Sequence, residues 1–265
     1  MAQSANNPSG TREGELPAPP ALGHDSALFL DFDGTLVDIA DAPDEIDVSP
    51  GLPGILADLA IHLDGALAII SGRTIAELDR YLTPHTLPIA GVHGAEWRLP
   101  DGTYAPVSQD IQQQADAIAQ ALEPLARTRG LIVEAKPGAV ALHYRQAPDS
   151  REDCERAMLE ALEDLTGWTM LHGKMVIEAR RRDVSKAGAI TRLMDHRPFS
   201  GRTPVFIGDD RTDEDGFRAV NAADGISIKV GAGSTIARHR LAGVSKVRRY
   251  LAAATESLSV DWSLQ

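Results

Sequence analysis

The stretch Ala27-Leu28-Phe29-Leu30-Asp31-Phe32-Asp33-Gly34-Thr35-Leu36 joins an apolar run directly to two carboxylates. Four consecutive apolar residues are typical of a strand that is buried on both faces, as in a parallel sheet. Asp31 and Asp33 then follow the carboxyl end of this strand, which is the edge where open α/β sheets bind their ligands. The stretch therefore predicts both the type of sheet and the position of the functional site.

Further apolar runs along the chain end in the same abrupt way. Residues 66–70 lead into Ser71-Gly72-Arg73, residues 87–90 into Gly91-Val92-His93-Gly94, and residues 204–207 into Gly208-Asp209-Asp210. Helical patterns separate these runs, and one of them begins with the capping box Thr74-Ile75-Ala76-Glu77. Strands that alternate with helices predict a doubly wound α/β fold around a parallel sheet.

The segment between about Gly102 and Ile177 has a different pattern. Two amphipathic helical patterns each precede a pair of short strand patterns, in the order αββαββ. This order predicts an antiparallel four-stranded sheet with both helices on one face, inserted into the first domain as an α+β cap. We expect a core domain at residues 26–101 and 180–265, the cap at 102–179, and a disordered tail at 1–25, which is rich in Pro, Gly, Ala, Ser and Asn.

The composition, with 43% hydrophobic and 24% charged residues, is that of an ordinary globular protein. A net charge of −12 argues against nucleic acid or an acidic membrane as a partner, because both require a basic face. No apolar run approaches the ~18 residues of a membrane span, and the first residues do not form a signal peptide. The single cysteine, Cys154, cannot form an internal disulfide, which suits the reducing cytoplasm.

Asp31 and Asp33 suit phosphoryl transfer through a covalent intermediate. One carboxylate can attack phosphorus to form an aspartyl phosphate, and the other can protonate the leaving alcohol and later deprotonate water. Two aspartates at this spacing are by themselves more often a solvated turn, but the buried strand before them favours catalysis. Ser71 offers a hydroxyl and Lys186 a positive charge for the phosphoryl oxygens, which need such donors.

The acidic cluster that begins at Asp209 has two compatible explanations. Asp31, Asp33 and Asp209 together would suit Mg²⁺, which prefers oxygen ligands. Alternatively, Thr212 and Asp213 cap the helix that follows.

These separated motifs resemble those of the haloacid dehalogenase superfamily. The resemblance spans about residues 27–230 and rests on Asp31-Phe32-Asp33-Gly34-Thr35-Leu36, on Ser71 and Lys186, and on Gly208-Asp209-Asp210-Arg211-Thr212-Asp213-Glu214-Asp215. It implies a Rossmann-like core. A cap inserted between the second and third motifs is similar to that of the sugar-phosphate phosphatases. Within that subclass, residues 91–96, 141–145 and 173–178 resemble the trehalose-6-phosphate phosphatase family.

The resemblance implies a role for each motif residue. Asp31 would be the nucleophile and Asp33 the acid/base, while Ser71 and Lys186 would hold the phosphoryl group. The Mg²⁺ ligands would come from Asp31, Asp33 (through its backbone carbonyl), Asp209 and Asp213. The substrate-binding residues would be Arg73, His93, Lys136, Arg145, Lys174, Glu178 and Arg180.

The charged cap residues also have support in the strand patterns. His143 and Arg145 share one face of a predicted strand, and Lys174, Glu178 and Arg180 alternate with apolar residues along another. One face of the cap sheet is therefore charged and could face the catalytic strand ends. The stretch around Lys186 departs from the family pattern, which usually has Pro at the Arg181 position and Gly-x-x-Lys-Gly around the lysine.

The resemblance implies a magnesium-dependent enzyme that hydrolyses trehalose 6-phosphate. The alternatives are a phosphatase for sucrose, mannosylglycerate or hexose phosphate, a phosphomutase, and a non-catalytic sugar-phosphate-binding domain. A dehalogenase is disfavoured, because the second aspartate and the acidic motif serve phosphate and metal. With 265 residues the chain is too short to add a glycosyltransferase, so we expect any trehalose-phosphate synthase on a separate chain. We expect a monomer.

Overall fold

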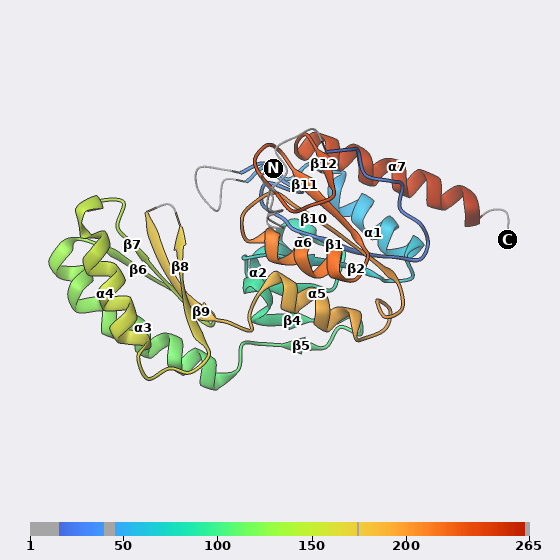
Figure 1. Cartoon of the computed structure of the whole chain (residues 1–265). Helices are drawn as coiled ribbons and strands as arrows, with labels where there is room; N and C mark the ends of the chain where they lie inside the picture. The colour runs from blue at the N-terminus through green and yellow to red at the C-terminus, as the bar shows by residue number, and fades with distance from the viewer. Residues whose placement is uncertain (1–15, 40–45, 174, 263–265) are drawn as a thin grey trace, which may run out of the picture.

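The strands of the structure, a computed structural model that describes residues 16–39, 46–173 and 175–262, form two separate sheets (Figure 1). The larger sheet has eight strands in the order β12-β11-β10-β1-β2-β3-β4-β5, parallel from β12 to β3 and antiparallel beyond. The smaller has four antiparallel strands in the order β6-β7-β9-β8. The predicted fold class, a doubly wound core with an antiparallel cap, is confirmed.

The central strands of the large sheet come from the apolar runs seen in the sequence. β1 lies between β10 and β2, and all of its residues are buried. The strands of this sheet are β1 (Ser26–Leu30), β2 (Leu67–Ile70), β3 (Ile89–Gly91), β4 (Glu96–Arg98), β5 (Tyr104–Ala105), β10 (Thr203–Gly208), β11 (Ile226–Val230) and β12 (His239–Leu241).

Helices cover both faces of this sheet. On one face α1 (Leu52–His62) packs against α7 (Val244–Trp262), and on the other α5 (Lys186–Met194) packs against α6 (Asp213–Ala222) (Figure 1). The helix that follows β2 is α2 (Ile75–Leu82), and it begins with the predicted capping box. Among the helices of the described part of the chain, none has the length and apolar character needed to cross a bilayer.

The cap has its own hydrophobic core between its sheet and two helices, α3 (Gln109–Arg129) and α4 (Arg151–Leu162). Side chains such as Val140 and Ile177 point from the sheet into this core. The cap strands are β6 (Ile132–Lys136), β7 (Ala139–His143), β8 (Trp168–Gly173) and β9 (Val176–Arg181). The helices lie on the outer side of the sheet, so its other face is turned toward the large domain (Figure 1).

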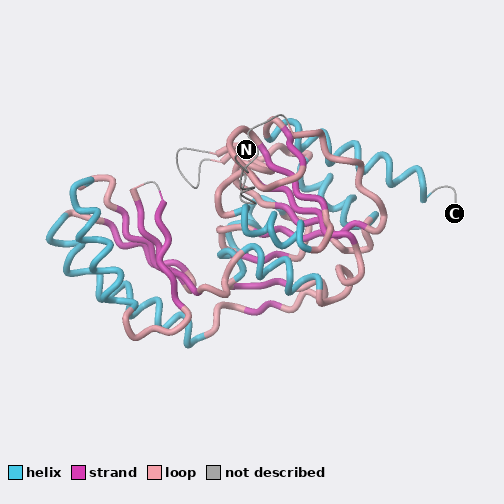
Figure 2. The backbone as a smooth tube through the Cα atoms, viewed as in Figure 1, coloured by secondary structure: helices cyan, strands magenta, loops and turns pink. Residues whose placement is uncertain are grey.

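Two short loop segments, residues 106–108 and 182–185, join the cap to the core (Figure 2). Their positions differ slightly from the predicted limits of the cap. Tyr104–Ala105 was predicted to lie in the cap but pairs with β4 in the large sheet. Arg180–Arg181 was predicted to lie in the core but completes β9 in the cap sheet.

Residues 16–25 are packed against the core and differ from the predicted disordered tail. The backbone carbonyl of Pro17 accepts a hydrogen bond from the backbone N–H of Arg240, and that of Pro20 accepts one from the Tyr250 hydroxyl. Leu22 is 4% exposed and belongs to the main hydrophobic core. The prediction is wrong here because the partners of this segment, such as Arg240 and Tyr250, are distant in sequence. Residues 1–15 lie outside the described residues.

Candidate active site

The aspartates suggested by the sequence, Asp31, Asp33 and Asp209, follow the carboxyl ends of β1 and β10. These strands are parallel neighbours, and the backbone N–H of Asp31 donates to the carbonyl oxygen of Ile207 at 3.0 Å. The register brings the loop after Asp31 against Asp209. Gly34 has a φ of +75°, and a Cβ at this position would collide with the Asp209 carboxylate. The approach of the two loops therefore requires glycine at this position.

Asp31, the predicted nucleophile, is 4% exposed at the base of the site. Its Oδ1 accepts a hydrogen bond from Lys186 Nζ at 2.7 Å, and its Oδ2 accepts one from Thr35 Oγ1 at 3.2 Å. Burial raises the pKa of Asp31 to about 6, although the charge of Lys186 acts in the opposite direction. The carboxylate is thus oriented by its neighbours and has less water around it than a surface carboxylate.

Lys186 begins α5, where the Ser185 hydroxyl accepts the backbone N–H of Gly188 at 3.0 Å as an N-cap. Its side chain is 3% exposed, and its Nζ donates to Asp213 Oδ1 at 2.6 Å as well as to Asp31. Burial alone would lower the pKa of Lys186, but the two carboxylates outweigh burial and hold this pKa above its ordinary value. The lysine is therefore a fixed positive charge between two aspartates.

Asp213 is fully buried at the first turn of α6. Its Oδ2 accepts the backbone N–H groups of Asp209 and Asp210, each at 2.9 Å, so this side chain shapes the acidic loop. Asp210 in turn accepts the backbone N–H of Thr212 at 2.8 Å. The predicted capping role is wrong for Thr212, whose side chain makes no cap hydrogen bond to the helix. Asp210 and Asp213 instead accept the backbone N–H groups of the turn before the helix.

Three carboxylates, those of Asp31, Asp209 and Asp213, each offer an oxygen within 4.8 Å of the others. Burial raises the pKa of Asp209 to about 6 and that of Asp213 to about 8, and in both cases neighbouring carboxylates add to the shift. One lysine contacts two of the three carboxylates, so negative charge is in excess. Oxygen donors with excess negative charge fit a hard divalent cation such as Mg²⁺. The Asp33 carboxylate lies outside this group.

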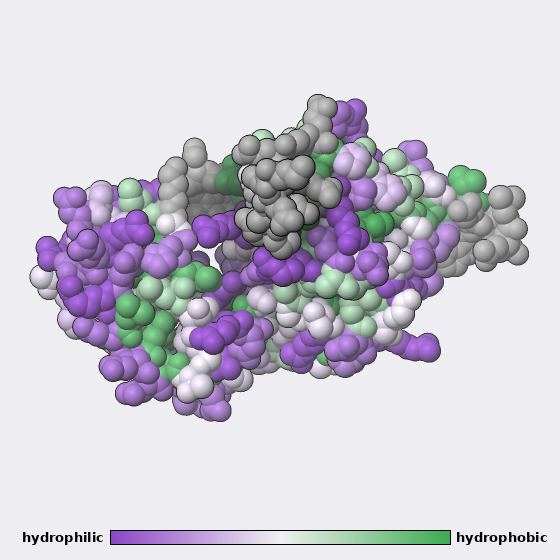
Figure 3. Space-filling view, in the orientation of Figure 1, coloured by the Kyte–Doolittle hydropathy of each residue, from purple (hydrophilic) through white to green (hydrophobic). Residues whose placement is uncertain are grey.

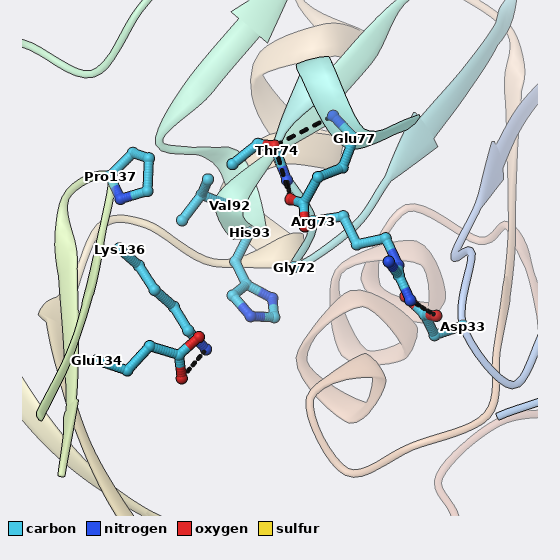
Figure 4. Close-up of a pocket in the computed structure, with 10 residues that line it drawn as sticks. All are labelled: Asp33, Gly72, Arg73, Thr74, Glu77, Val92, His93, Glu134, Lys136 and Pro137. Carbon is cyan, nitrogen blue, oxygen red and sulfur yellow. Dashed lines mark hydrogen bonds and ion pairs between the residues drawn. The ribbon is translucent and has the colours of Figure 1, made fainter. Parts of the chain in front are cut away.

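Asp33 instead forms a two-pronged pair with Arg73. Arg73 Nε donates to Asp33 Oδ2 and Nη2 donates to Oδ1, both at 2.7 Å (Figure 4). The hydrogen bond to Asp33 raises the pKa of Arg73 above its ordinary value. The sequence resemblance placed Arg73 among the sugar-binding residues, but in this structure its guanidinium contacts the predicted acid/base.

Ser71 is 1% exposed at the end of β2, one strand away from Asp31. Its Oγ accepts the backbone N–H of Arg73 at 3.1 Å, and its carbonyl accepts the backbone N–H of His93 at 2.8 Å. The hydroxyl is therefore near the other strand ends, and its backbone links the loops after β2 and β3.

His93 lies in a strained turn after β3, in which Val92 and His93 have φ values of +47° and +58°. Backbone strain of this kind in residues other than glycine is common at functional sites. The Nδ1 atom of His93 is buried and has no hydrogen-bond partner among the residues that the structure describes. Burial, together with the charges of Lys186 and Arg180, lowers the pKa of His93 to about 3, so the ring is neutral.

A cleft of about 300 Å³ lies between the core and the cap, within the usual size range of small-molecule sites. Core residues Asp33, Arg73 and His93 line one side, and cap residues Glu134 and Lys136 line the other (Figure 4). The space-filling view shows the surface hollowed between the two lobes, with hydrophilic residues beside the hollow (Figure 3).

The cleft-facing side of the cap sheet carries three of the substrate-binding residues that the sequence suggested, Lys136, Glu178 and Arg180. Glu134 and Glu178 both pair in register with Ala141, so they share one face. Arg180 shares this face and is 7% exposed, and its buried Nε lacks a hydrogen-bond partner within the described parts of the chain. Lys136 Nζ lies 3.6 Å from Glu134 Oε2.

Arg145 is not brought to this face. β7 ends at His143, and Arg145 lies exposed in the turn beyond it, so the predicted alternation with His143 is wrong at that position. The strand ends because the chain turns here, where the backbone N–H of Ala147 donates to the carbonyl oxygen of Tyr144 at 3.0 Å. Lys174 lies outside the described residues.

Some residues of the site were not found from the sequence. Thr35 contacts Asp31, and Glu134 bonds to His143 Nε2 at 2.8 Å beside the cleft. Lys229 is 6% exposed, and its Nζ donates to the carbonyl oxygens of Asp209 and Val230. A lysine between Ile228 and Val230 of β11 was a visible signal for this last contact, because a buried lysine needs polar partners.

Similarity to solved structures defines the class. The structure of a Bacteroides thetaiotaomicron protein, described as a phosphatase of the haloalkanoate (HAD) superfamily, superposes with a TM-score of 0.55. At 16% identity, the match covers 95% of this chain and 100% of that one, which shows the shared fold. The protein thus has the fold of the HAD phosphatases.

The sequence comparisons identify the family within that class. The sequence model of the trehalose-phosphatase family matches residues 29–247, and the chain belongs to this family. A trehalose-6-phosphate phosphatase of Escherichia coli (strain K12) is 42% identical over 252 residues, which is 90% of each chain. The solved structure of a trehalose-6-phosphate phosphatase related protein has a TM-score of 0.69 at 30% identity, covering 88% of this chain and 98% of that one.

Proposed function

We propose that the protein hydrolyses trehalose 6-phosphate to trehalose and inorganic phosphate through an aspartyl phosphate on Asp31. The observation that carries the proposal is the contact of Asp31 with Lys186, two residues along the chain from Asp33, which lines the cleft between the core and the polar cap face. Membership of the trehalose-phosphatase family supports the choice of substrate.

In the first half-reaction an oxygen of Asp31 attacks phosphorus, and the bond from phosphorus to the sugar oxygen breaks. Asp33 gives a proton to that oxygen, so trehalose leaves as the neutral alcohol. Lys186 and the Ser71 hydroxyl hold the phosphoryl oxygens. Because both are almost fully buried, these donors are fixed before the reaction starts and act with little competition from water.

In the second half-reaction a water oxygen attacks the aspartyl phosphate. The bond from phosphorus to the Asp31 oxygen breaks, the proton of the water passes to the Asp33 carboxylate, and inorganic phosphate leaves. Each turnover therefore returns Asp31 to a carboxylate and Asp33 to its proton-bearing form.

Mg²⁺ is the proposed cofactor, and Asp31, Asp209 and Asp213 would hold it. Their oxygens lie within 4.8 Å of one another, and the surrounding loop carries excess negative charge. The predicted fourth ligand, the backbone carbonyl of Asp33, stays a prediction. When bound, the ion would neutralise negative charge on the nucleophile and the phosphoryl oxygens.

The uncovered cap face would bind the sugar. Lys136, Glu178 and Arg180 lie on it, and a disaccharide has many hydroxyls beyond the reach of the strand ends. His93 has a neutral ring and a buried Nδ1 that lacks a partner among the described residues, so it would meet a hydroxyl next to the leaving oxygen. Arg145, although outside the sheet, stays a prediction as a sugar ligand.

Phosphate release from a panel of esters tests the substrate. We expect kcat/KM for trehalose 6-phosphate to exceed the values for sucrose 6-phosphate, glucose 6-phosphate and a mannosylglycerate phosphate, with Mg²⁺ required throughout. A preference for one of the other sugars would leave a phosphatase with a different substrate. Phosphate release from none of them would favour a sugar-phosphate-binding domain.

The setting of the enzyme is also a proposal. A cytoplasmic location is supported by the single cysteine, Cys154, which is buried and unpaired. A monomer, with the synthase on a separate chain, stays the expectation from the sequence.

A further inference from the structure

The pair between Arg73 and Asp33 is the strongest interaction in the cleft that the proposed reaction does not yet use. Both oxygens of Asp33 accept from the guanidinium at 2.7 Å, which is the bidentate geometry of a strong charge-assisted pair. The Arg73 side chain is 11% exposed and that of Asp33 is 37% exposed. The arginine is therefore held within the core, while the carboxylate faces the cleft.

The position of Arg73 is fixed independently of Asp33. Its backbone N–H donates to Ser71 Oγ, and its carbonyl accepts the backbone N–H of Val92 at 3.0 Å. Its guanidinium carbon lies 6.0 Å from the centre of the Phe32 ring and 5.9 Å from that of Tyr81. A guanidinium held beside two aromatic rings is pre-organised, so it orients Asp33 more than Asp33 orients it.

The hydrogen-bond pattern matches only one of the two tasks proposed for Asp33. As the acid, Asp33 has to present an O–H to the leaving sugar oxygen, which conflicts with two oxygens that both accept from Arg73. As the base it has to accept a proton from water, and an ionised carboxylate has about four acceptor sites, of which Arg73 uses two. The pair is therefore compatible with the second half-reaction.

We propose that Arg73 is a positioning residue for Asp33, which it orients for the attack of water on the aspartyl phosphate. In that step the water oxygen bonds to phosphorus, the bond to Asp31 breaks, and the proton passes to an oxygen of Asp33. Arg73 separates from Asp33 while the sugar oxygen is being protonated, and it pairs again once the proton has left. This inference rests on the proposed roles of Asp31 and Asp33, and it replaces sugar binding as the task of Arg73.

The test compares Arg73→Gln and Arg73→Lys with Arg80→Gln, which removes an exposed arginine of α2, the helix that follows Arg73. Turnover of p-nitrophenyl phosphate and of trehalose 6-phosphate is measured, and the phosphoenzyme is trapped by acid quench after reaction with labelled substrate. In Arg73→Gln we expect kcat to fall about 10- to 100-fold, a part of the ~10²–10⁴-fold that general acid–base catalysis contributes. The kcat values for the two esters should become similar, because both esters give the same phosphoenzyme and its hydrolysis would then limit the rate. Phosphoenzyme should also accumulate.

Arg73→Lys can donate one of the two hydrogen bonds to Asp33, so it should recover part of the lost kcat. It should also accumulate less phosphoenzyme than Arg73→Gln. Arg80→Gln should behave as the wild type. If Arg73→Gln does not fold, which circular dichroism would reveal, Arg73→Lys carries the same test against the wild type.

Two results would overturn the inference. A raised KM for trehalose 6-phosphate with unchanged kcat and no trapped phosphoenzyme would make Arg73 a sugar ligand. A loss of kcat confined to the sugar ester, again without phosphoenzyme, would place Arg73 in the first half-reaction. The p-nitrophenyl ester reports on Arg73 whatever the natural sugar is, so absent turnover of trehalose 6-phosphate by the wild type would overturn only the proposed substrate.

Discussion

Lys186 Nζ lies 2.7 Å from Asp31 Oδ1, although the two residues are 155 positions apart in the sequence. Both side chains are almost fully buried, and the whole cap lies between them along the chain. A buried ion pair adds little net stability, because the desolvation of both charges offsets their attraction. The proposed aspartyl-phosphate mechanism, however, needs a nucleophilic carboxylate close to a cation for the phosphoryl oxygens, so function explains the pair better than stability does.

The first prediction concerns the nucleophile. Asp31→Asn keeps the volume and the acceptor oxygen of the side chain but removes the charge that attacks phosphorus. We expect phosphate release to fall below detection while the circular dichroism spectrum stays that of the wild type. Trapped phosphoenzyme should also be absent. Substantial turnover by this variant would rule out an aspartyl phosphate at this position.

The second prediction concerns pH and the proposed metal site. The pKa values of Asp31 and Asp209 are raised from 3.8 to about 6, and that of Asp213 to about 8. Between pH 4 and 8 the folded metal-free protein therefore binds more protons at these groups than the unfolded chain does. By linkage, the contribution of these three aspartates to the free energy of unfolding is complete below about pH 4. It is lost as the pH rises through their pKa values in the folded protein.

Mg²⁺ should relieve this loss, so the rise in Tm on adding the ion should be larger at pH 8 than at pH 5. At a concentration 100 times its Kd, the ion should raise Tm by about 5–10 °C. Asp209→Asn is the control, because it removes one of the three carboxylates. It should reduce both the rise in Tm on adding Mg²⁺ and the dependence of that rise on pH. A rise in Tm that is the same at both pH values would show that Mg²⁺ binds elsewhere.

Much of the site follows from local patterns in the sequence. Apolar runs that end in polar residues fixed β1, β2, β3 and β10, and neighbouring parallel strands have to bring Asp31 and Asp209 to one edge. The helix start at Lys186 is likewise local, because Ser185 caps it. Such features depend on residues a few positions apart, and their physical causes act at that range.

What the sequence did not predict depends on distant partners. The Arg73–Asp33 pair joins residues 40 positions apart, and neither side chain has a local reason to choose the other. Residues 16–25 have the composition of a tail, yet β12 and α7 supply their partners. Arg145 shows the opposite error, in which a local alternation was extended past the end of β7 and into the turn that a hydrogen bond between Ala147 and Tyr144 closes.

The third prediction concerns Gly72, which lies between Ser71 and Arg73. A Cβ at Gly72 would lie 2.8 Å from Cε1 and Nε2 of the His93 ring, so the ring would have to move out of its position in the cleft. Gly72→Ala should therefore raise the KM for trehalose 6-phosphate and lower stability by about 1–3 kcal/mol, the usual cost of overpacking.

Gly54→Ala is the matched control for this substitution. Gly54 lies inside α1, and an added Cβ would meet nothing within 4 Å. Alanine in a helix is favoured over glycine by roughly 0.5–1 kcal/mol, so this variant should be slightly more stable, with unchanged kinetics. If the two alanine variants show the same KM, the ring of His93 takes no part in substrate binding.

The last prediction is that the cap controls which sugar is accepted, while the core carries the chemistry. Glu178 lies half-buried on the cleft-facing side of β9, on the same face as Glu134 and Arg180. A carboxylate there can accept hydrogen bonds from two sugar hydroxyls, and its loss leaves those hydroxyls without a partner when the sugar covers the cap face. Hydrogen bonds to a charged group are worth about 1.5–3 kcal/mol, so Glu178→Ala should lower kcat/KM for trehalose 6-phosphate by about ten- to a hundredfold.

p-Nitrophenyl phosphate, which has no sugar to bind, should be hydrolysed by Glu178→Ala at the wild-type rate. Glu160→Ala, on the exposed surface of α4, removes the same charge from the cap and should change neither rate. Equal losses on both esters in Glu178→Ala would instead mean that Glu178 supports the fold or the core site, and specificity would then have to lie elsewhere in the cleft.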